Sequence, residues 1–172
     1  MSTVEQRLEE AGYTLPAVSK PLAAYVPTMR DGDTVYTSGQ LPVVDGELAA
    51  TGKVGETVSV EDAQGYARTC VLNGLAAIKA EIGDLDKIAQ ITKVVGFVSS
   101  AADFDEQHLV VNGASEFLGE IFGEKGTHAR SAVGVAMLWR LYTDSQRRAD
   151  AAAQALAQER RRLDEQQSQL RR

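Results

Sequence analysis

The sequence has few of the residues that cross-link a chain or hold a metal ion. Its 172 residues include one cysteine, Cys70, and two histidines. A single cysteine excludes an intrachain disulfide bond, and the scattered Cys and His residues lack the spacing of a zinc site. No His or Asp stands where it would activate Cys70, so we interpret this residue as a small core residue rather than a nucleophile. We therefore expect no metal site.

Long apolar runs are also missing. No run approaches the roughly 18 residues that a membrane span needs, and the first residues, "MSTVEQRLEEAGYTLP", are too charged for a signal peptide. Hydrophobic residues nevertheless make up 44% of the chain, enough to bury a core without disulfides or metals. These features predict a globular protein of the cytoplasm with no membrane partner.

The body of the chain lacks a basic footprint. The net charge is −6, and residues 144–172 carry seven arginines against five acidic residues, so the remainder carries −8. Proteins that bind nucleic acid need positive surface to neutralise phosphates. An acidic body therefore argues against nucleic acid as the main ligand.

The apolar pattern predicts an α+β fold. An Asp-Gly turn in "RDGD" favours a hairpin near residues 30–33. The segment 59–83 has a capping box, Ser59 with Asp62, and ends at Gly83, so it predicts a long helix. Together with the neighbouring patterns, these signals give a short N-terminal helix at 4–12, two or three strands before residue 59, a helix at 59–83, a strand at 88–100, a helix at 103–123 and a strand at 128–138.

The last predicted strand contains the unbroken apolar run "SAVGVAML". Such runs are typical of strands buried on both faces. The two long helices can cover one face of the sheet. We expect another subunit to cover the other face.

Several stretches in this order resemble the Rid family, also called the YjgF family. They are "AAYVPT", "GDTVYTSGQLP", "VEDAQGYARTCVLN", "GDLDKIAQITKVVGFVSS", "VNGASEFL" and "HARSAVGVAML", and they span roughly residues 15–138. The resemblance implies a chorismate-mutase-like fold, with a single sheet covered on one face by two helices. It also implies a homotrimer with clefts between subunits that bind small 2-oxo or 2-imino acids. Deaminase members hydrolyse 2-iminobutanoate and 2-iminopropanoate to 2-oxo acids and ammonia, without a metal or organic cofactor.

The resemblance also assigns site residues. Arg130 falls on the family's catalytic arginine, which binds the substrate carboxylate. Arginine suits that task because its planar guanidinium can make two parallel hydrogen bonds to a carboxylate and stays charged. The other positions that match the family's substrate-binding residues are Tyr25, Ser38, Gly39, Asn112 and Ala132. Many family members have cysteine at the position of Ala132. His128, two residues before Arg130, would face the same side of a strand. Two interpretations of His128 remain, a residue that shapes the cleft and a surface residue.

The chain departs from the family after "VGVAML". The family continues with a final strand that carries a glutamate thought to orient the attacking water, and no such strand or glutamate can be found here. We therefore divide the chain into a Rid-like domain at 1–142 and a helical extension at 143–172. The extension has leucines at intervals of seven, but the positions three or four residues after them are polar, whereas a stable coiled coil needs both positions apolar. We expect a long, marginal helix that either frays, packs along its own trimer or pairs weakly with other tails.

Three functions remain open from the sequence. The first is an imine deaminase, weakened by the missing glutamate. The second is a trimer that binds 2-oxo acids without catalysis, and the third is a scaffold that displays three C-terminal helices. Ribonuclease activity fits less well, because the body is acidic and offers no pair of histidines to serve as general base and general acid.

Overall fold

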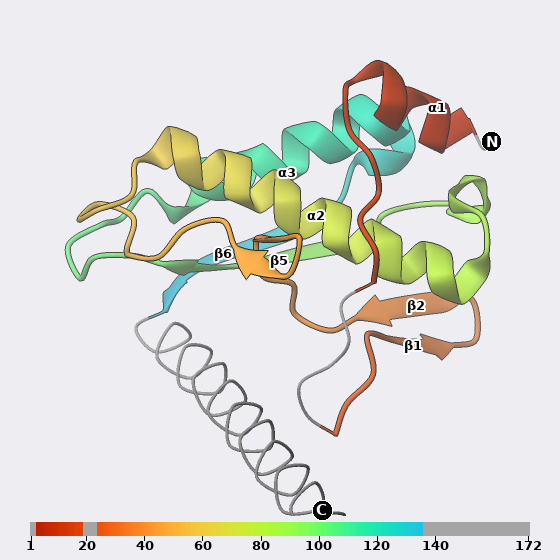
Figure 1. Ribbon diagram of the computed structural model, residues 1–172, viewed down its shortest axis with the longest axis horizontal. Coiled ribbons are helices and arrows are strands. Elements are labelled where there is room, and N and C mark those ends of the chain that lie inside the picture. The colour runs from red at the N-terminus through yellow and green to blue at the C-terminus, as the bar shows by residue number, and fades with distance from the viewer. Residues whose placement is uncertain (1–2, 19–23, 136–172) are drawn as a thin grey trace, which may run out of the picture. The chain divides into compact units, whose positions relative to one another are not determined.

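The structure, a computed structural model, describes residues 3–18 and 24–135. The proposed boundary at residue 142 and the helical extension lie outside these ranges. Helices and strands follow one another in the α+β order that the sequence predicts (Figure 1). The elements are α1 (Thr3–Glu10), β1 (Thr28–Asp31), β2 (Thr34–Thr37), β3 (Val43–Val44), β4 (Glu47–Leu48), α2 (Val60–Ile82), η1 (Leu85–Lys87), β5 (Lys93–Ser99), α3 (Gln107–Phe122), η2 (Gly123–Gly126) and β6 (Ala129–Val135).

Helix α2 begins and ends where its capping residues predict. The Ser59 hydroxyl oxygen accepts a hydrogen bond from the Asp62 backbone N–H at 3.0 Å. At the other end Gly83 adopts a left-handed conformation, with φ of 82°, and its N–H bonds to the Lys79 carbonyl. Glycine reaches this conformation without the steric cost that a Cβ would add.

Helix α3 begins slightly later than expected. Its first residue is Gln107, and Glu106 precedes it without a capping hydrogen bond from its side chain. The segment expected to open the helix instead turns at Phe104, whose N–H bonds to the Ala101 carbonyl. The helix ends at Phe122, directly before Gly123, as predicted.

The described strands pair as three two-stranded sheets, whereas the sequence led us to expect a single sheet. β1 and β2 form an antiparallel hairpin around Gly32, as the Asp-Gly turn predicts, and β3 and β4 form a second, very short one. β5 and β6 are parallel neighbours joined by α3, the usual way to connect parallel strands. The sequence predicts strands from their local composition, but it does not determine which strand edges meet.

The β5–β6 pair has one covered and one exposed face. Val98 of β5 is buried against Val110 and Val111 of α3, and both helices lie on this side of the strands (Figure 1). Val95, Phe97 and Val133 alternate with the inward residues and are exposed, Phe97 at 59%. The expected burial on both faces is therefore found on one face within the described part of the chain.

A larger core lies between the helices. It contains Leu8 of α1, Leu75 of α2, Leu85 of η1, and Phe117 and Ile121 of α3. All five side chains are almost completely buried. Helix α1 is also held by polar contacts: the Asp86 carboxylate accepts from the backbone N–H groups of Thr3 and Val4, at 2.7 and 2.9 Å.

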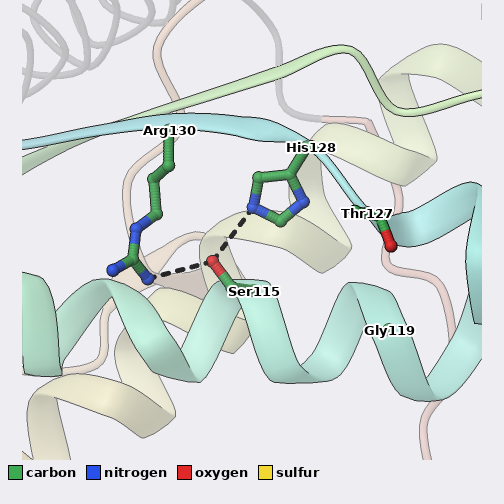
Figure 2. A pocket seen from close by; sticks show the side chains of 5 residues that line it. All are labelled: Ser115, Gly119, Thr127, His128 and Arg130. Atoms are coloured by element: carbon green, nitrogen blue, oxygen red, sulfur yellow. Dashed lines mark hydrogen bonds between the residues drawn. The ribbon is translucent and has the colours of Figure 1, made fainter.

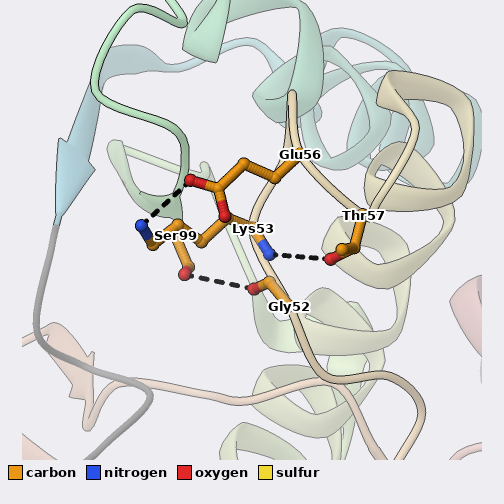
Figure 3. A network of polar contacts seen from close by, with 5 residues as sticks. All are labelled: Gly52, Lys53, Glu56, Thr57 and Ser99. Atoms are coloured by element: carbon orange, nitrogen blue, oxygen red, sulfur yellow. Dashed lines mark hydrogen bonds and ion pairs between the residues drawn. The ribbon is translucent and has the colours of Figure 1, made fainter.

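The loop at residues 52–58 is fastened to the end of β5 (Figure 3). The Ser99 hydroxyl donates to the Gly52 carbonyl at 3.3 Å, and the Val54 N–H donates to the Ser99 carbonyl at 2.9 Å. Within the loop, Lys53 forms an ion pair with Glu56 at 3.1 Å. These bonds hold the loop against β5. Val54 of the loop can therefore bury its side chain in a second, smaller core cluster, which also contains Val98, Val110 and Val111.

Glycine allows α3 to lie close to α2. A Cβ built on Gly113 would stand 2.3 Å from the Gln64 carbonyl oxygen, whereas a Cβ on Gly119 of the same helix would meet no atom within 4 Å. Backbone cannot move aside as the tip of a side chain can. The spacing between the two long helices therefore depends on the missing side chain at residue 113.

We expect Gly113→Ala to lower the free energy of unfolding by about 1–3 kcal/mol, the usual cost of overpacking. Gly119→Ala is the matched control, since it should instead stabilise α3 by up to about 1 kcal/mol through helix propensity. Urea unfolding followed by circular dichroism measures both. Equal effects of the two substitutions would contradict the tight contact at Gly113.

The capping of α1 predicts a pH dependence of stability. The backbone N–H groups of Thr3 and, next, Val4 lower the pKa of Asp86. A lowered pKa in the folded state means that the stabilisation is complete above the unfolded pKa of about 3.9 and is lost as pH falls through the folded value. The melting-temperature difference between wild type and Asp86→Asn should therefore shrink on acidification, while the exposed Asp105→Asn control should follow wild type throughout. A difference that stays constant into strong acid would exclude this role of Asp86.

Candidate functional site

Arg130 stands on β6 and reaches toward α3. It pairs with Val94 of β5 in the parallel register. Residues at alternate positions, such as Ala132, share its face of the strand, and Ala132 packs against the core cluster beneath α3. A rigid strand thus carries the guanidinium to the surface of the helix.

One nitrogen of Arg130 is fully engaged by α3. Nη1 donates to the Asn112 Oδ1 at 2.7 Å and to the Ser115 Oγ at 3.2 Å. Asn112 and Ser115 are three residues apart and so lie on one face of the helix. Within the described residues, Nε and Nη2 of Arg130 have no hydrogen-bond partner and no carboxylate forms a salt bridge with the residue. In the part of the chain that the structure describes, Arg130 therefore has no ion pair with a nearby acid. Such a pair would have given it a purely structural role.

Ser115 and His128 complete this cluster (Figure 2). Ser115 Oγ lies 3.0 Å from His128 Nε2, and His128 Nδ1 lies 2.6 Å from the Gly126 carbonyl oxygen. These side chains line a surface pocket of about 310 Å³ together with Gly119, Thr127 and Arg130. Sequence reasoning missed Ser115, although its spacing from Asn112 on a predicted helix could have indicated it.

The other expected site residues form a separate group. Tyr25 is 52% exposed, and the Ser38 hydroxyl donates to the Val26 carbonyl at 2.6 Å. Gly39 follows, also exposed. No hydrogen bond joins this group to Arg130 or Asn112 within residues 3–18 and 24–135. The described part of one chain thus presents two groups of the expected residues, Arg130 with Asn112 and Ala132, and Tyr25 with Ser38 and Gly39.

Cys70 has the chemistry of a core residue. Burial raises the pKa of its thiol to about 12, and a hydrogen bond with its own backbone opposes this only in part. The thiolate, which is the nucleophilic form, is therefore scarce at neutral pH.

The described residues contain no group of three His, Cys, Asp or Glu side chains placed to hold a metal ion. None of the described helices is both long and apolar enough to cross a bilayer.

Known proteins resemble the chain over most of its length. Two crystal structures match it well: a protein of unknown function from Agrobacterium tumefaciens, at 49% identity over 79% of this chain and 84% of that one with a TM-score of 0.74, and a "putative endoribonuclease" from Shewanella oneidensis, at 34% identity over 80% and 91% with a TM-score of 0.77. The crystal structure of TdcF from E. coli with bound serine matches at 28% identity over 73% and 84%, with a TM-score of 0.50.

Sequence comparison leads to the same family. Protein TCP17 of Trypanosoma cruzi is 40% identical over 136 residues, which are 78% of this chain and 85% of that protein. Residues 5–141 match the family model described as "YjgF/chorismate mutase-like, putative endoribonuclease". The resemblance inferred from "YTSGQLP" and "ARSAVGVAML" is thereby confirmed, and the chain belongs to the YjgF/chorismate mutase-like family.

Proposed function

We propose that the protein binds a small 2-oxo or 2-imino acid through Arg130 and hydrolyses 2-imino acids to 2-oxo acids and ammonia. The observation that carries this proposal is the way the guanidinium is held. Nη1 is fixed by Asn112 and Ser115, so Nε and Nη2 are left as a parallel pair of donors. A carboxylate accepts two such bonds with good geometry.

A solved relative supports this ligand class. TdcF binds serine in its crystal structure, and serine carries the α-carboxylate that 2-oxo and 2-imino acids share. Transfer of this property to the present chain is part of the proposal.

We further propose that the protein is a homotrimer with its binding clefts between subunits. The exposed apolar face of β5–β6, formed by Val95, Phe97 and Val133, offers a surface for the neighbouring subunit to cover. The hairpin exposes a second apolar pair, Met29 and Tyr36, which lie directly opposite each other. Subunit contacts would also bring the Tyr25 group of one chain to the Arg130 group of the next.

The proposed reaction needs little assistance from the protein. A protonated imine is already electrophilic at the carbon next to the carboxylate, and a water molecule adds to that carbon. A positioned base accelerates such a step by about 10²–10⁴-fold. The family's water-orienting glutamate has no counterpart in the sequence after residue 135, which favours the second candidate function, a trimer that binds 2-oxo acids without turnover.

Endoribonuclease activity, which the family description mentions, has less support. RNA binding would require a basic surface, and the chain has a net charge of −6. The pocket beside Arg130 contains one histidine rather than the acid and base pair that phosphodiester cleavage would use.

The proposal is tested with freshly generated 2-iminobutanoate, produced by an amino-acid oxidase, with buffer hydrolysis subtracted. Arg130→Lys keeps the charge but loses the parallel donors, so we expect binding of 2-oxobutanoate to weaken by about 1.5–3 kcal/mol with little change in melting temperature. Arg30→Lys, an exposed change on β1, serves as the control. Binding without hydrolysis by wild type supports the second candidate, and equal affinity in Arg130→Lys and wild type contradicts a carboxylate site at Arg130.

The assembly is tested by light scattering at micromolar concentration, where we expect the mass of three subunits. Phe97→Asp places a charge at the centre of the exposed apolar face and should dissociate the trimer, because burying an unpaired carboxylate costs several kcal/mol. Glu116→Asp, an exposed change on α3, should leave the mass unchanged. A wild-type mass of one subunit would exclude both the trimer and the shared cleft.

A further inference from the structure

The pocket beside Arg130 contains a proton path that the proposed function leaves unassigned. His128 Nδ1 faces the Gly126 carbonyl oxygen at 2.6 Å. A carbonyl oxygen can only accept, so Nδ1 carries the proton of the neutral ring and Nε2 is left as an acceptor. The Ser115 hydroxyl, 3.0 Å from Nε2, therefore donates its proton to His128 (Figure 2).

Arg130 acts on the same hydroxyl from the other side. Its Nη1 donates to the Ser115 oxygen at 3.2 Å. A hydrogen bond from a cation stabilises negative charge on the oxygen that accepts it. Ser115 is thus polarised in one direction, with its oxygen toward the guanidinium and its proton toward the imidazole.

The pocket leaves room for a small molecule next to this pair. Gly119 lines it one helical turn after Ser115, and a Cβ at Gly119 would meet no atom within 4 Å. None of the five residues that line the pocket carries a carboxylate. Of these five, the imidazole of His128 is the group that can serve as a general base, through the free lone pair of Nε2.

We propose that His128, acting through the Ser115 hydroxyl, accepts the proton of the attacking water at the Arg130 site. The pair would take the part that the family's glutamate plays and this chain lacks. The inference rests on the proposed imine hydrolysis. The arrangement that carries it is the continuous chain from Arg130 through Ser115 and His128 to the Gly126 carbonyl.

The reaction balances along this path. The water oxygen bonds to the imine carbon, and the π electrons of the C=N bond move to nitrogen. The water gives one proton to Ser115 Oγ while Ser115 passes its own proton to His128 Nε2. The imidazolium returns that proton to the amino nitrogen by the same route, the C–N bond breaks, and the leaving ammonia takes the remaining hydroxyl proton as ammonium. The 2-oxo acid is left and both side chains regain their starting state.

The test compares the full-length wild type with His128→Gln and Ser115→Ala in the 2-iminobutanoate assay. Loss of a general base should lower kcat by about 10²-fold or more in both variants. The affinity for 2-oxobutanoate should stay unchanged in His128→Gln, because Arg130 keeps its bonds to both Asn112 and Ser115. In Ser115→Ala one of these two bonds is lost, so the affinity should fall slightly and far less than kcat. His108→Gln is the matched control, since His108 is the chain's other histidine and is exposed on the first turn of α3; it should retain the wild-type kcat.

Chemical rescue separates a proton acceptor from a structural residue. His128→Ala opens space for a free imidazole, which should restore part of kcat, whereas His128→Gln fills that space and should not respond. Enzyme-free reactions with imidazole supply the baseline, and melting temperatures check that each variant folds.

The possible results distinguish the two proposals. Wild type no faster than buffer would overturn the imine hydrolase itself, and this inference with it. An active wild type whose kcat survives His128→Gln would overturn only the proton path. A loss of affinity equal to the loss of kcat, without rescue by imidazole, would also overturn it and would assign Ser115 and His128 to holding Arg130 in place.

Discussion

The close packing of α3 between α2 and the β5–β6 pair is the constraint on which the rest of the structure depends. On one side Gly113 lets the backbone of α3 approach that of α2 at Gln64. On the other side Gly96 of β5 accommodates Val111, whose nearest methyl carbon would lie 2.3 Å from a Cβ at that position. Gly113 thus sets the spacing of α3 from α2, and Gly96 sets the height of α3 above the strands. That height decides whether Arg130 of β6 can reach Asn112 and Ser115.

The same packing explains why a charged side chain can be mounted at the end of an apolar strand. Further along the pair, Ala132 and then Val98 pack with the valines of α3 in one apolar cluster. Toward its beginning the covering residues of α3 become polar, and Arg130 meets an amide and a hydroxyl instead of valines. The guanidinium therefore loses part of its hydration but gains fixed partners, which offsets the cost of ordering a long side chain.

Local features of the fold were predictable, and relations between distant elements were less so. The ends of α2 follow from Ser59 and Gly83, because capping is decided by neighbouring residues. The pairing of β5 with β6 and the division into three small sheets are decided by packing between segments far apart, which composition does not encode. At the site, family motifs singled out Arg130 and Asn112, and the structure joins them. Ser115 escaped notice because a serine within a helix has no signal of its own until the histidine it contacts is placed.

The anchoring of α1 has a consequence for how the protein is made. Its backbone is capped by Asp86, 83 residues later than Thr3, and Arg7 donates to the carbonyl of Ile121, 114 residues further along. An eight-residue helix is too short to be stable alone in water. This helix must therefore wait, with Val4 and Leu8 uncovered, until almost the whole of α3 has been synthesised. Helix α1 thus completes its fold only after a segment more than a hundred residues further along, and until then two apolar side chains of the future core stay exposed to water.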